Sequence, residues 1–153
     1  MTKKKKTTIV ISIILLLLIL ALSTPYLLNK LSQGEFSSLP DGVNIRIQNT
    51  STEVVPKSEI YLINGDEEKV HLTEFPELKP KDTISFNTKY RPKDDYNLAM
   101  SYEINGKKYE KILMYAGANS TKLGINAKVK SINDKNEIET TSKIFDGLHL
   151  YEE

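Results

Sequence analysis

Residues 9–22 form an apolar run, interrupted only by Ser12, that follows directly after four consecutive lysines and two threonines. Aliphatic residues at the centre of a bilayer each favour insertion by about 0.3–0.6 kcal/mol, so the run contributes roughly 5 kcal/mol. With its uncharged flanks the segment extends over residues 7–28, which is long enough for a helix to cross about 30 Å of hydrocarbon. The sequence therefore predicts a transmembrane helix at 7–28, in contact with the lipid bilayer, and a polar domain after it.

The four lysines predict the orientation of this helix, because basic residues beside a membrane span stay on the cytoplasmic side. They are Lys3, Lys4, Lys5 and Lys6. We therefore expect a cytoplasmic stub at 1–6, a single-pass signal-anchor in the cell membrane at 7–28, and an extracytoplasmic remainder.

Ala21-Leu22-Ser23 also fits the cleavage site of a secretory signal peptide. The apolar stretch continues past that site to Leu28, which favours a retained anchor, and both interpretations export the remainder.

The exported part carries a small excess of acid. All 20 acidic residues follow residue 30, whereas four of the 21 basic residues precede it. Nucleic-acid-binding domains present a basic patch, so we expect no nucleic-acid partner.

The chain has no cysteine, although small exported domains often use disulfides. The domain must therefore be held together by its core, and the composition, rich in Lys, Ile and Asn, is typical of a bacterial surface protein.

Residues 29–40 contain several turn formers and predict a stalk. From Asp41 onward, apolar residues recur at every second position, as in half-buried strands. We expect strands at 43–47, 58–63 with a partner after residue 68, 83–90, 96–115 as a hairpin, 123–129 and 138–145, and the tail 146–153 stays open. Seven or eight short strands predict an all-β fold for 41–153, a single antiparallel two-sheet sandwich.

Two hairpins are predicted from their turns. Asn105-Gly106 fits a two-residue type I′ turn, which sets Glu103 opposite Lys108 on one face. On the other face this turn pairs Tyr102 with Tyr109, Leu98 with Leu113, and Tyr96 with Tyr115. For the strand at 58–63, a five-residue loop at 64–68 keeps the apolar faces matched. That loop pairs Leu62 with Val70 and Ile60 with Leu72.

The Leu-x-Pro-x-Asp connection at 78–82 leads into an alternating strand, and the Asn-Gly hairpin follows it. In these features residues 41–145 resemble the immunoglobulin-like or fibronectin-III-like modules of small single-pass bacterial envelope proteins. The resemblance implies an immunoglobulin-like sandwich, and it carries no catalytic residues to this chain. The core Trp and the disulfide of antibody-type domains are absent, because the chain contains neither Trp nor Cys.

No residue pattern points to catalysis, a cofactor or a metal. The chain has two histidines, His71 and His149, and a metal or acid–base site needs partners that no spacing marks. The acids at 66–68 and 94–95 do not match the alternating ligands of a calcium loop. Motifs of serine nucleophiles and phosphate-binding glycine loops are absent. We therefore expect a non-enzymatic protein without a cofactor.

The tyrosines of the 96–115 hairpin leave two interpretations open. Their shared face is either an aromatic binding surface or part of the core, with hydroxyl groups at the rim. The core interpretation is favoured because Leu98 and Leu113 share that face, and it leaves Ile112 and Met114 partly exposed on the other. The candidate partner surface consists of Tyr61, His71, Tyr96, Tyr115, Ile112 and Met114.

The anchor, the short stalk and the sandwich pattern together predict a protein-binding module of the cell envelope. It would be a subunit of an envelope complex or a membrane-tethered protector of the immunity type. One alternative is a cell-wall or carbohydrate-binding module, which requires Tyr96 and Tyr115 to be exposed together. A small envelope enzyme is the third hypothesis, and it requires a pocket that gathers three or more acids with His71.

Overall fold

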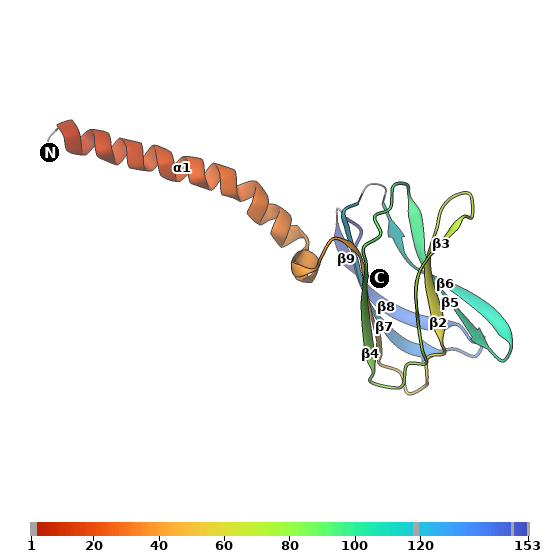
Figure 1. The fold of residues 1–153 in the computed structure, drawn as a ribbon. Helices are drawn as coiled ribbons and strands as arrows, with labels where there is room; N and C mark the ends of the chain where they lie inside the picture. The colour runs from red at the N-terminus through yellow and green to blue at the C-terminus, as the bar shows by residue number, and fades with distance from the viewer. Residues whose placement is uncertain (1–2, 118–119, 148, 153) are drawn as a thin grey trace. The chain divides into compact units, whose positions relative to one another are not determined.

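The computed structural model describes residues 3–117, 120–147 and 149–152. The chain divides into two compact units, Met1–Ser37 and Ser38–Glu153 (Figure 1). Helix α1 (Lys3–Ser32) dominates the first unit and is followed by a short 3-10 helix, η1 (Gly34–Ser38). The described part of the second unit consists of β-strands and the loops that join them.

Helix α1 contains an 18-residue stretch, Ile11–Leu28, with a mean hydropathy of 2.5, long and apolar enough to cross a membrane. Membrane anchors and signal sequences both have helices of this length and composition. Helix α1 extends to Ser32, so the first part of the expected stalk is helical and η1 occupies much of the rest. The chain then turns at Gly34, whose φ of 52° is the left-handed conformation that commonly follows a helix.

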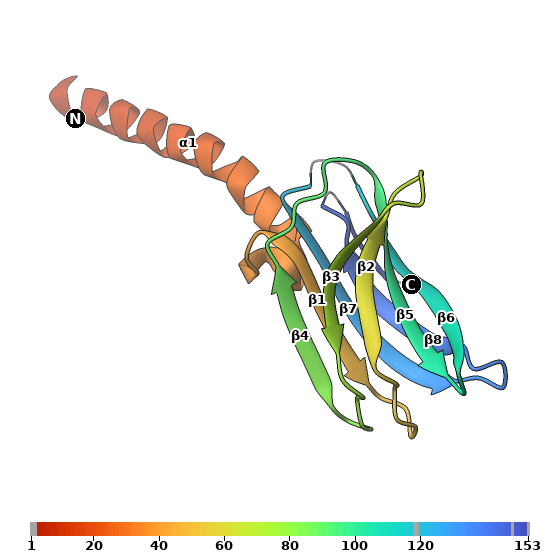
Figure 2. The same ribbon diagram turned by 45° about the vertical axis from the view of Figure 1, so that its right-hand side comes forward.

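Two β-sheets form the second unit, as Figures 1 and 2 show. The strands are β1 (Gly42–Asn49), β2 (Ser58–Ile63), β3 (Lys69–Phe75), β4 (Thr83–Thr88), β5 (Tyr96–Ile104), β6 (Lys107–Ala116), β7 (Lys122–Ile132), β8 (Ile138–Phe145) and β9 (Leu150–Glu152). A five-stranded sheet has the order β4-β1-β7-β8-β9, and a four-stranded sheet has the order β3-β2-β5-β6. The predicted all-β, two-sheet architecture is confirmed, and the tail contributes β9 as an additional strand.

One strand pair corrects the prediction of a purely antiparallel fold. β1 and β7 run parallel, with Val43 opposite Leu123 and Ile45 opposite Ile125. The chain changes sheets after β1, β3, β4 and β6, and it returns to β1 in the same direction. No hairpin turn joins a parallel pair, so no local signal in the sequence announces it.

The inward faces of the two sheets pack into one apolar core. Its side chains that are at most 2% exposed include Val43, Ile45, Ile47, Val55, Ile60, Leu62, Phe75, Leu98, Met100, Met114, Leu123, Ile125, Ala127, Val129, Ile138 and Ile144. Burial of each such side chain other than Ala127 stabilises the fold by about 1.5–3 kcal/mol relative to its exposure. The alternating pattern of the sequence is therefore the pattern of the core.

The β5–β6 hairpin has the predicted turn but not the predicted pairing throughout. Asn105 and Gly106 have φ of 54° and 77°, as a type I′ turn requires. Tyr102 lies opposite Tyr109, and Glu103 lies opposite Lys108, as expected. Beyond them a β-bulge shifts the register, so the pairs expected for Tyr96 and Leu98 are wrong. The observed partners are Ala116 for Tyr96 and Met114 for Leu98.

A second bulge lies in β3. The five-residue loop at 64–68 is confirmed, and Leu62 lies opposite Val70. Ile60, however, lies opposite Thr73 instead of Leu72, because the register shifts between Ile60 and Tyr61. Each bulge inserts one residue into the strand and moves the following residues to the other face of the sheet.

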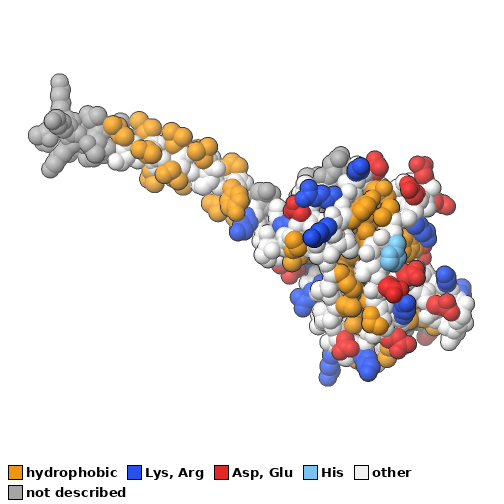
Figure 3. All heavy atoms as spheres, in the orientation of Figure 1, with side chains coloured by type: hydrophobic (Ala, Val, Ile, Leu, Met, Phe, Trp, Pro, Cys, Tyr) orange, Lys and Arg blue, Asp and Glu red, His pale blue; other side chains and the backbone are white. Residues whose placement is uncertain are grey.

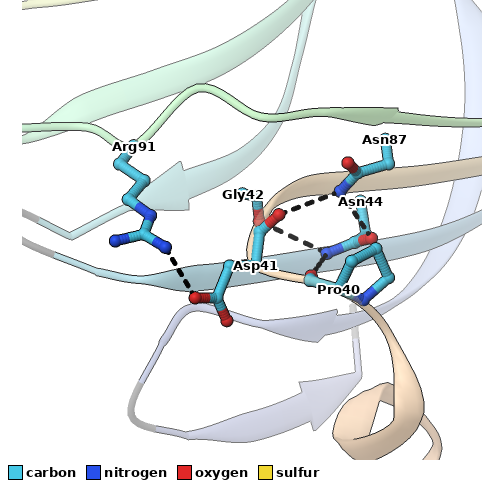
Figure 4. A network of polar contacts seen from close by, with 6 residues as sticks. All are labelled: Pro40, Asp41, Gly42, Asn44, Asn87 and Arg91. Atoms are coloured by element: carbon cyan, nitrogen blue, oxygen red, sulfur yellow. Dashed lines mark hydrogen bonds and ion pairs between the residues drawn. The ribbon is translucent and has the colours of Figure 1, made fainter.

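Polar contacts fix the point where the chain enters β1 (Figure 4). Asn44 Nδ2 donates to the carbonyl oxygen of Pro40 at 2.9 Å, and Asn87 Nδ2 donates to Asn44 Oδ1 at 3.0 Å. The guanidinium of Arg91 contacts the carboxylate of Asp41 at 2.7 Å. Residues from β4 and from the loop after it thus hold the segment that leads into β1.

Asn49 closes the other end of β1 and is fully buried. Its Nδ2 donates to the carbonyl oxygens of Glu53 at 2.7 Å and Leu78 at 2.8 Å. Its Oδ1 accepts from the backbone N–H of Ser51 at 3.0 Å and from the Ser51 hydroxyl at 2.7 Å. Both donors and both acceptor positions of the amide are therefore used.

We expect Asn49→Ala to lower the free energy of unfolding by about 2–4 kcal/mol, because four hydrogen bonds of a fully buried side chain are lost together. Urea denaturation of the full chain in detergent measures this. Asn97→Ala, at an exposed position of β5, is the matched control and should change stability by less than about 0.5 kcal/mol. Equal effects of the two substitutions would contradict this role of Asn49.

Candidate functional site

The surface of the four-stranded sheet that faces away from the core carries an ordered array of side chains, which we name the outer face. Each strand contributes one residue to each of three rows, because strands pair residue against residue. From β3 to β6 the rows are Glu74, Glu59, Ser101 and Glu110; His71, Tyr61, Ala99 and Ile112; and Lys69, Ile63, Asn97 and Tyr115. The outer face therefore combines four strands that are distant in sequence.

Tyr61, Glu110 and Lys69 form a polar cluster within this face. The Tyr61 hydroxyl donates to Glu110 Oε2, and Lys69 Nζ lies 2.9 Å from the same oxygen. Lys69 Nζ also lies 4.5 Å from the centre of the Tyr61 ring, within the range of a cation–π contact. These contacts connect β2, β3 and β6 across the small side chains of β5.

The cluster shifts the proton affinities of its members. Burial, followed by the hydrogen bond to Glu110, raises the pKa of Tyr61 to about 12. The hydrogen bonds from Tyr61 and then Lys69 lower the pKa of Glu110. At neutral pH the phenol is therefore a proton donor and the carboxylate is ionised, so the cluster is a fixed structural element of the face.

An apolar strip lies beside the cluster on β6. Ile112 is 49% exposed and Tyr115 is 48% exposed, more than any other large apolar side chain described between residues 38 and 152. Ala99 lies between Tyr61 and Ile112 in its row and is completely buried. The strip thus has a rigid base and a solvent-exposed top.

A shallow open depression of about 450 Å³ lies over the same face. The residues that line it include Glu59, Tyr61, His71, Ser101 and Glu110. It brings His71 together with two carboxylates, one of which already binds Tyr61 and Lys69. Within the described ranges, no group of three or more His, Cys, Asp or Glu side chains is placed to hold a metal ion.

The structure brings together four of the six candidate surface residues. Tyr61, His71, Ile112 and Tyr115 all belong to the outer face, although Tyr61, which bonds to Glu110 and contacts Lys69, is only 5% exposed. Tyr96 and Met114, in contrast, are part of the core cluster between the sheets, at 7% and 2% exposure, so their assignment to a surface is corrected. The burial of Tyr96 is what the core interpretation of the tyrosine face predicts, and the bulge in β6 explains Met114, because it turns Met114 inward and Tyr115 outward.

Glu110 and Lys69 were not singled out by the sequence, although they complete the polar cluster. Lys69 lies eight residues from Tyr61, on the other strand of the β2–β3 hairpin, whereas Glu110 is 49 residues away. The proximity of Glu110 follows from the strand order β3-β2-β5-β6. The predicted hairpin was therefore a signal for Lys69, and Glu110 required the alignment of all four strands.

We expect Tyr61→Phe to raise the pKa of Glu110 toward its ordinary value of 4.5, because the strongest hydrogen bond to its carboxylate is lost. A carboxyl group with a lowered pKa stabilises the fold above its ordinary pKa, and this contribution disappears as the pH falls through the lowered value. NMR titration of the Glu110 carboxyl carbon measures the shift. Tyr109→Phe removes a hydroxyl that contacts Asn136 and is the control. An unchanged Glu110 pKa in Tyr61→Phe would refute the assigned bond.

Comparison of the chain with protein-family models, with curated proteins and with solved structures finds no match. A functional assignment therefore has to come from the geometry of the outer face and from the apolar helix. The outer face offers the exposed side chains of Ile112 and Tyr115 beside the charges of Lys69 and Glu110.

Proposed function

We propose that the chain is a membrane-anchored, extracytoplasmic protein-binding module without enzymatic activity, and that the outer face is its binding surface. The observation that carries this proposal is the exposure of Ile112 and Tyr115 on a rigid sheet. Protein interfaces centre on exposed aromatic and aliphatic side chains and are surrounded by polar groups. Here Glu59, Lys69 and Glu110 supply that polar surround.

The location in the envelope rests on the N-terminal segment. Ile11–Leu28 has the length of a membrane span, and the four lysines before it favour a cytoplasmic N-terminus. The strands would then lie outside the cytoplasm. Two settings fit such a protein: a subunit of an envelope complex, or a tethered protector of the immunity type. An immunoglobulin-like topology is part of the same proposal, supported by two sheets between which the chain crosses repeatedly.

The alternatives have less support. A carbohydrate platform made of Tyr96 and Tyr115 requires both rings to be exposed, and Tyr96 is 7% exposed. An enzyme requires at least three acids around His71, and the depression brings two to it. Protein binding through the outer face uses the side chains that are accessible.

Site-specific crosslinking in intact cells tests the surface. A photo-crosslinker at Asn97, on the outer face, should give a discrete protein adduct, whereas one at the exposed Thr141 of β8 should not. Ile112→Asp should weaken the adduct by about thirtyfold, the effect of losing a hot-spot residue of about 2 kcal/mol. Thr141→Asp is the matched control and should leave it unchanged. Equal adducts at the two positions, or none at Asn97, would overturn the proposed surface.

Protease protection tests the topology. We expect an impermeant protease added to whole cells to remove a C-terminal tag while a tag before Lys3 stays intact, because the lysines retain the N-terminus inside. Permeabilised cells, in which both tags are cut, are the control. The mass of the mature chain separates a retained anchor from cleavage after Ser23. Survival of the C-terminal tag while a known surface protein is digested would exclude an extracytoplasmic domain.

A further inference from the structure

Strand β4 differs from the other edge strands of the two sheets. Natural proteins protect such edges from pairing with foreign strands by charged residues, bulges or short length. β3 and β6 each have a bulge and several charged residues, and β9 has only three residues. β4 reads Thr-Ile-Ser-Phe-Asn-Thr, has no charge, and pairs with β1 over six residues without a shift. Among the described edge strands, β4 is therefore the one that has no charged residue, no bulge and no short length to prevent pairing with another strand.

The backbone of β4 has free hydrogen-bonding groups on the side away from β1. The backbone N–H of Asn49, in β1, donates to the carbonyl oxygen of Asp82 at 2.9 Å, so Asp82 is directed toward β1. Bonding alternates along an antiparallel pair, so Thr83, Ser85 and Asn87 direct their N–H and C=O groups outward. No described strand pairs with them.

Apolar side chains accompany this edge. Val70 and Leu72 of β3 and Ile84 and Phe86 of β4 contact the core but are only partly buried. β3 and β4 form the edges of the two sheets on the same side of the sandwich (Figures 1 and 2), and Figure 3 shows apolar side chains gathered along that side. A strand added to β4 would direct every second side chain over these four partly buried apolar residues.

The charges around β4 restrict which strand can be added. Residues 79–93 contain five basic residues and one acid, in a domain that is otherwise acidic, and one of the five, Arg91, is paired with Asp41. The basic residues are Lys79, Lys81, Lys89, Arg91 and Lys93. An antiparallel pair of two β4 strands that aligns Ile84 with Phe86 would set Lys81 opposite Lys89, and the pairing centred on Phe86 would set Lys81 opposite Arg91. Like charges in opposite positions are destabilising, so a second copy is a poor occupant.

We propose that β4 is a docking edge for an extended segment of a partner protein, with apolar residues at alternate positions and acidic residues at both ends. The segment adds a strand to the five-stranded sheet, a recognition mode in which main-chain bonds give affinity and alternate side chains give specificity. This edge belongs to a different sheet from the outer face. It therefore adds a second surface and a defined partner class to the proposed function, and it can be tested separately.

A labelled octapeptide, Asp-Glu-Thr-Val-Thr-Val-Glu-Asp, is the probe, measured against the full chain in detergent by fluorescence anisotropy. Ser85→Pro removes an outward N–H and should weaken binding at least about tenfold, since a strand-pairing bond is lost and the proline ring obstructs the edge. Ser85→Ala keeps the N–H and is the matched control with unchanged binding. On binding, amide exchange should slow at Thr83, Ser85 and Asn87.

Charge variants of the peptide and of the protein test the acidic ends of the bound segment. The same peptide with Lys at both ends should bind several-fold more weakly, with a difference that shrinks as salt is added. The double substitution Lys81→Glu and Lys89→Glu should reverse this preference, and it tests the proposal even if Ser85→Pro disturbs the β1–β4 pairing. Ile112→Asp should leave peptide binding unchanged, which separates this edge from the outer face. Three results would each overturn the proposal. The first is unchanged binding by Ser85→Pro while the β1–β4 pairing is intact. The others are equal binding of the two peptides, and no binding at millimolar concentration.

Discussion

Burial of the apolar inner faces between the two sheets is the constraint on which the rest of this structure depends. The chain has no cysteine, so no disulfide shares the task. The sequence 112–115 is Ile-Leu-Met-Tyr, four apolar residues in a row. A regular strand would turn Leu113 and Met114 to opposite faces of the sheet, so it could not bury both of them. A bulge lets Leu113 and Met114 both enter the core, at 3% and 2% exposure, and leaves Ile112 and Tyr115 outside. The apolar strip of the outer face is thus a consequence of how the core is filled.

Local signals in the sequence predicted much of the fold. β2 and β8 begin and end at the expected residues, and the Asn105-Gly106 turn has the expected backbone conformation. These features depend on neighbours in the chain, where period-two patterns and turn chemistry act. The apolar helix was likewise recognisable from a continuous run of residues.

The remaining features depend on packing between distant segments. The parallel pairing of β1 and β7 involves no turn, and the bulges reflect competition for space in the core. The contact of Tyr61 with Glu110 requires the order of four strands to be known. Candidate residues that keep the expected pairing, such as Tyr61 and His71, were therefore assigned to the right face. Those beyond the β6 bulge, Met114 and Tyr115, were exchanged between faces.

The two candidate surfaces differ in how they connect to the apolar helix along the chain. Among the described strands, β4 pairs with β1 alone, and β1 follows the segment that contains α1 and η1. A partner held on β4 therefore pulls directly on β1, which is bonded along its length to β4 on one side and to β7 on the other. A partner on the outer face acts on the other sheet, and its pull reaches β1 only through side-chain packing in the core.

This difference has a physical consequence for a tethered protein. Two strands joined by many hydrogen bonds resist sliding when these bonds are loaded together, and β1 is bonded to β4 in antiparallel and to β7 in parallel orientation. Asn49 at one end of β1 and the contacts of Asp41 and Asn44 at the other hold both ends of the strand in place. With the apolar helix as the proposed membrane anchor and a partner strand at β4 as proposed, β1 would carry the load between them, and its polar contacts at both ends fit that role.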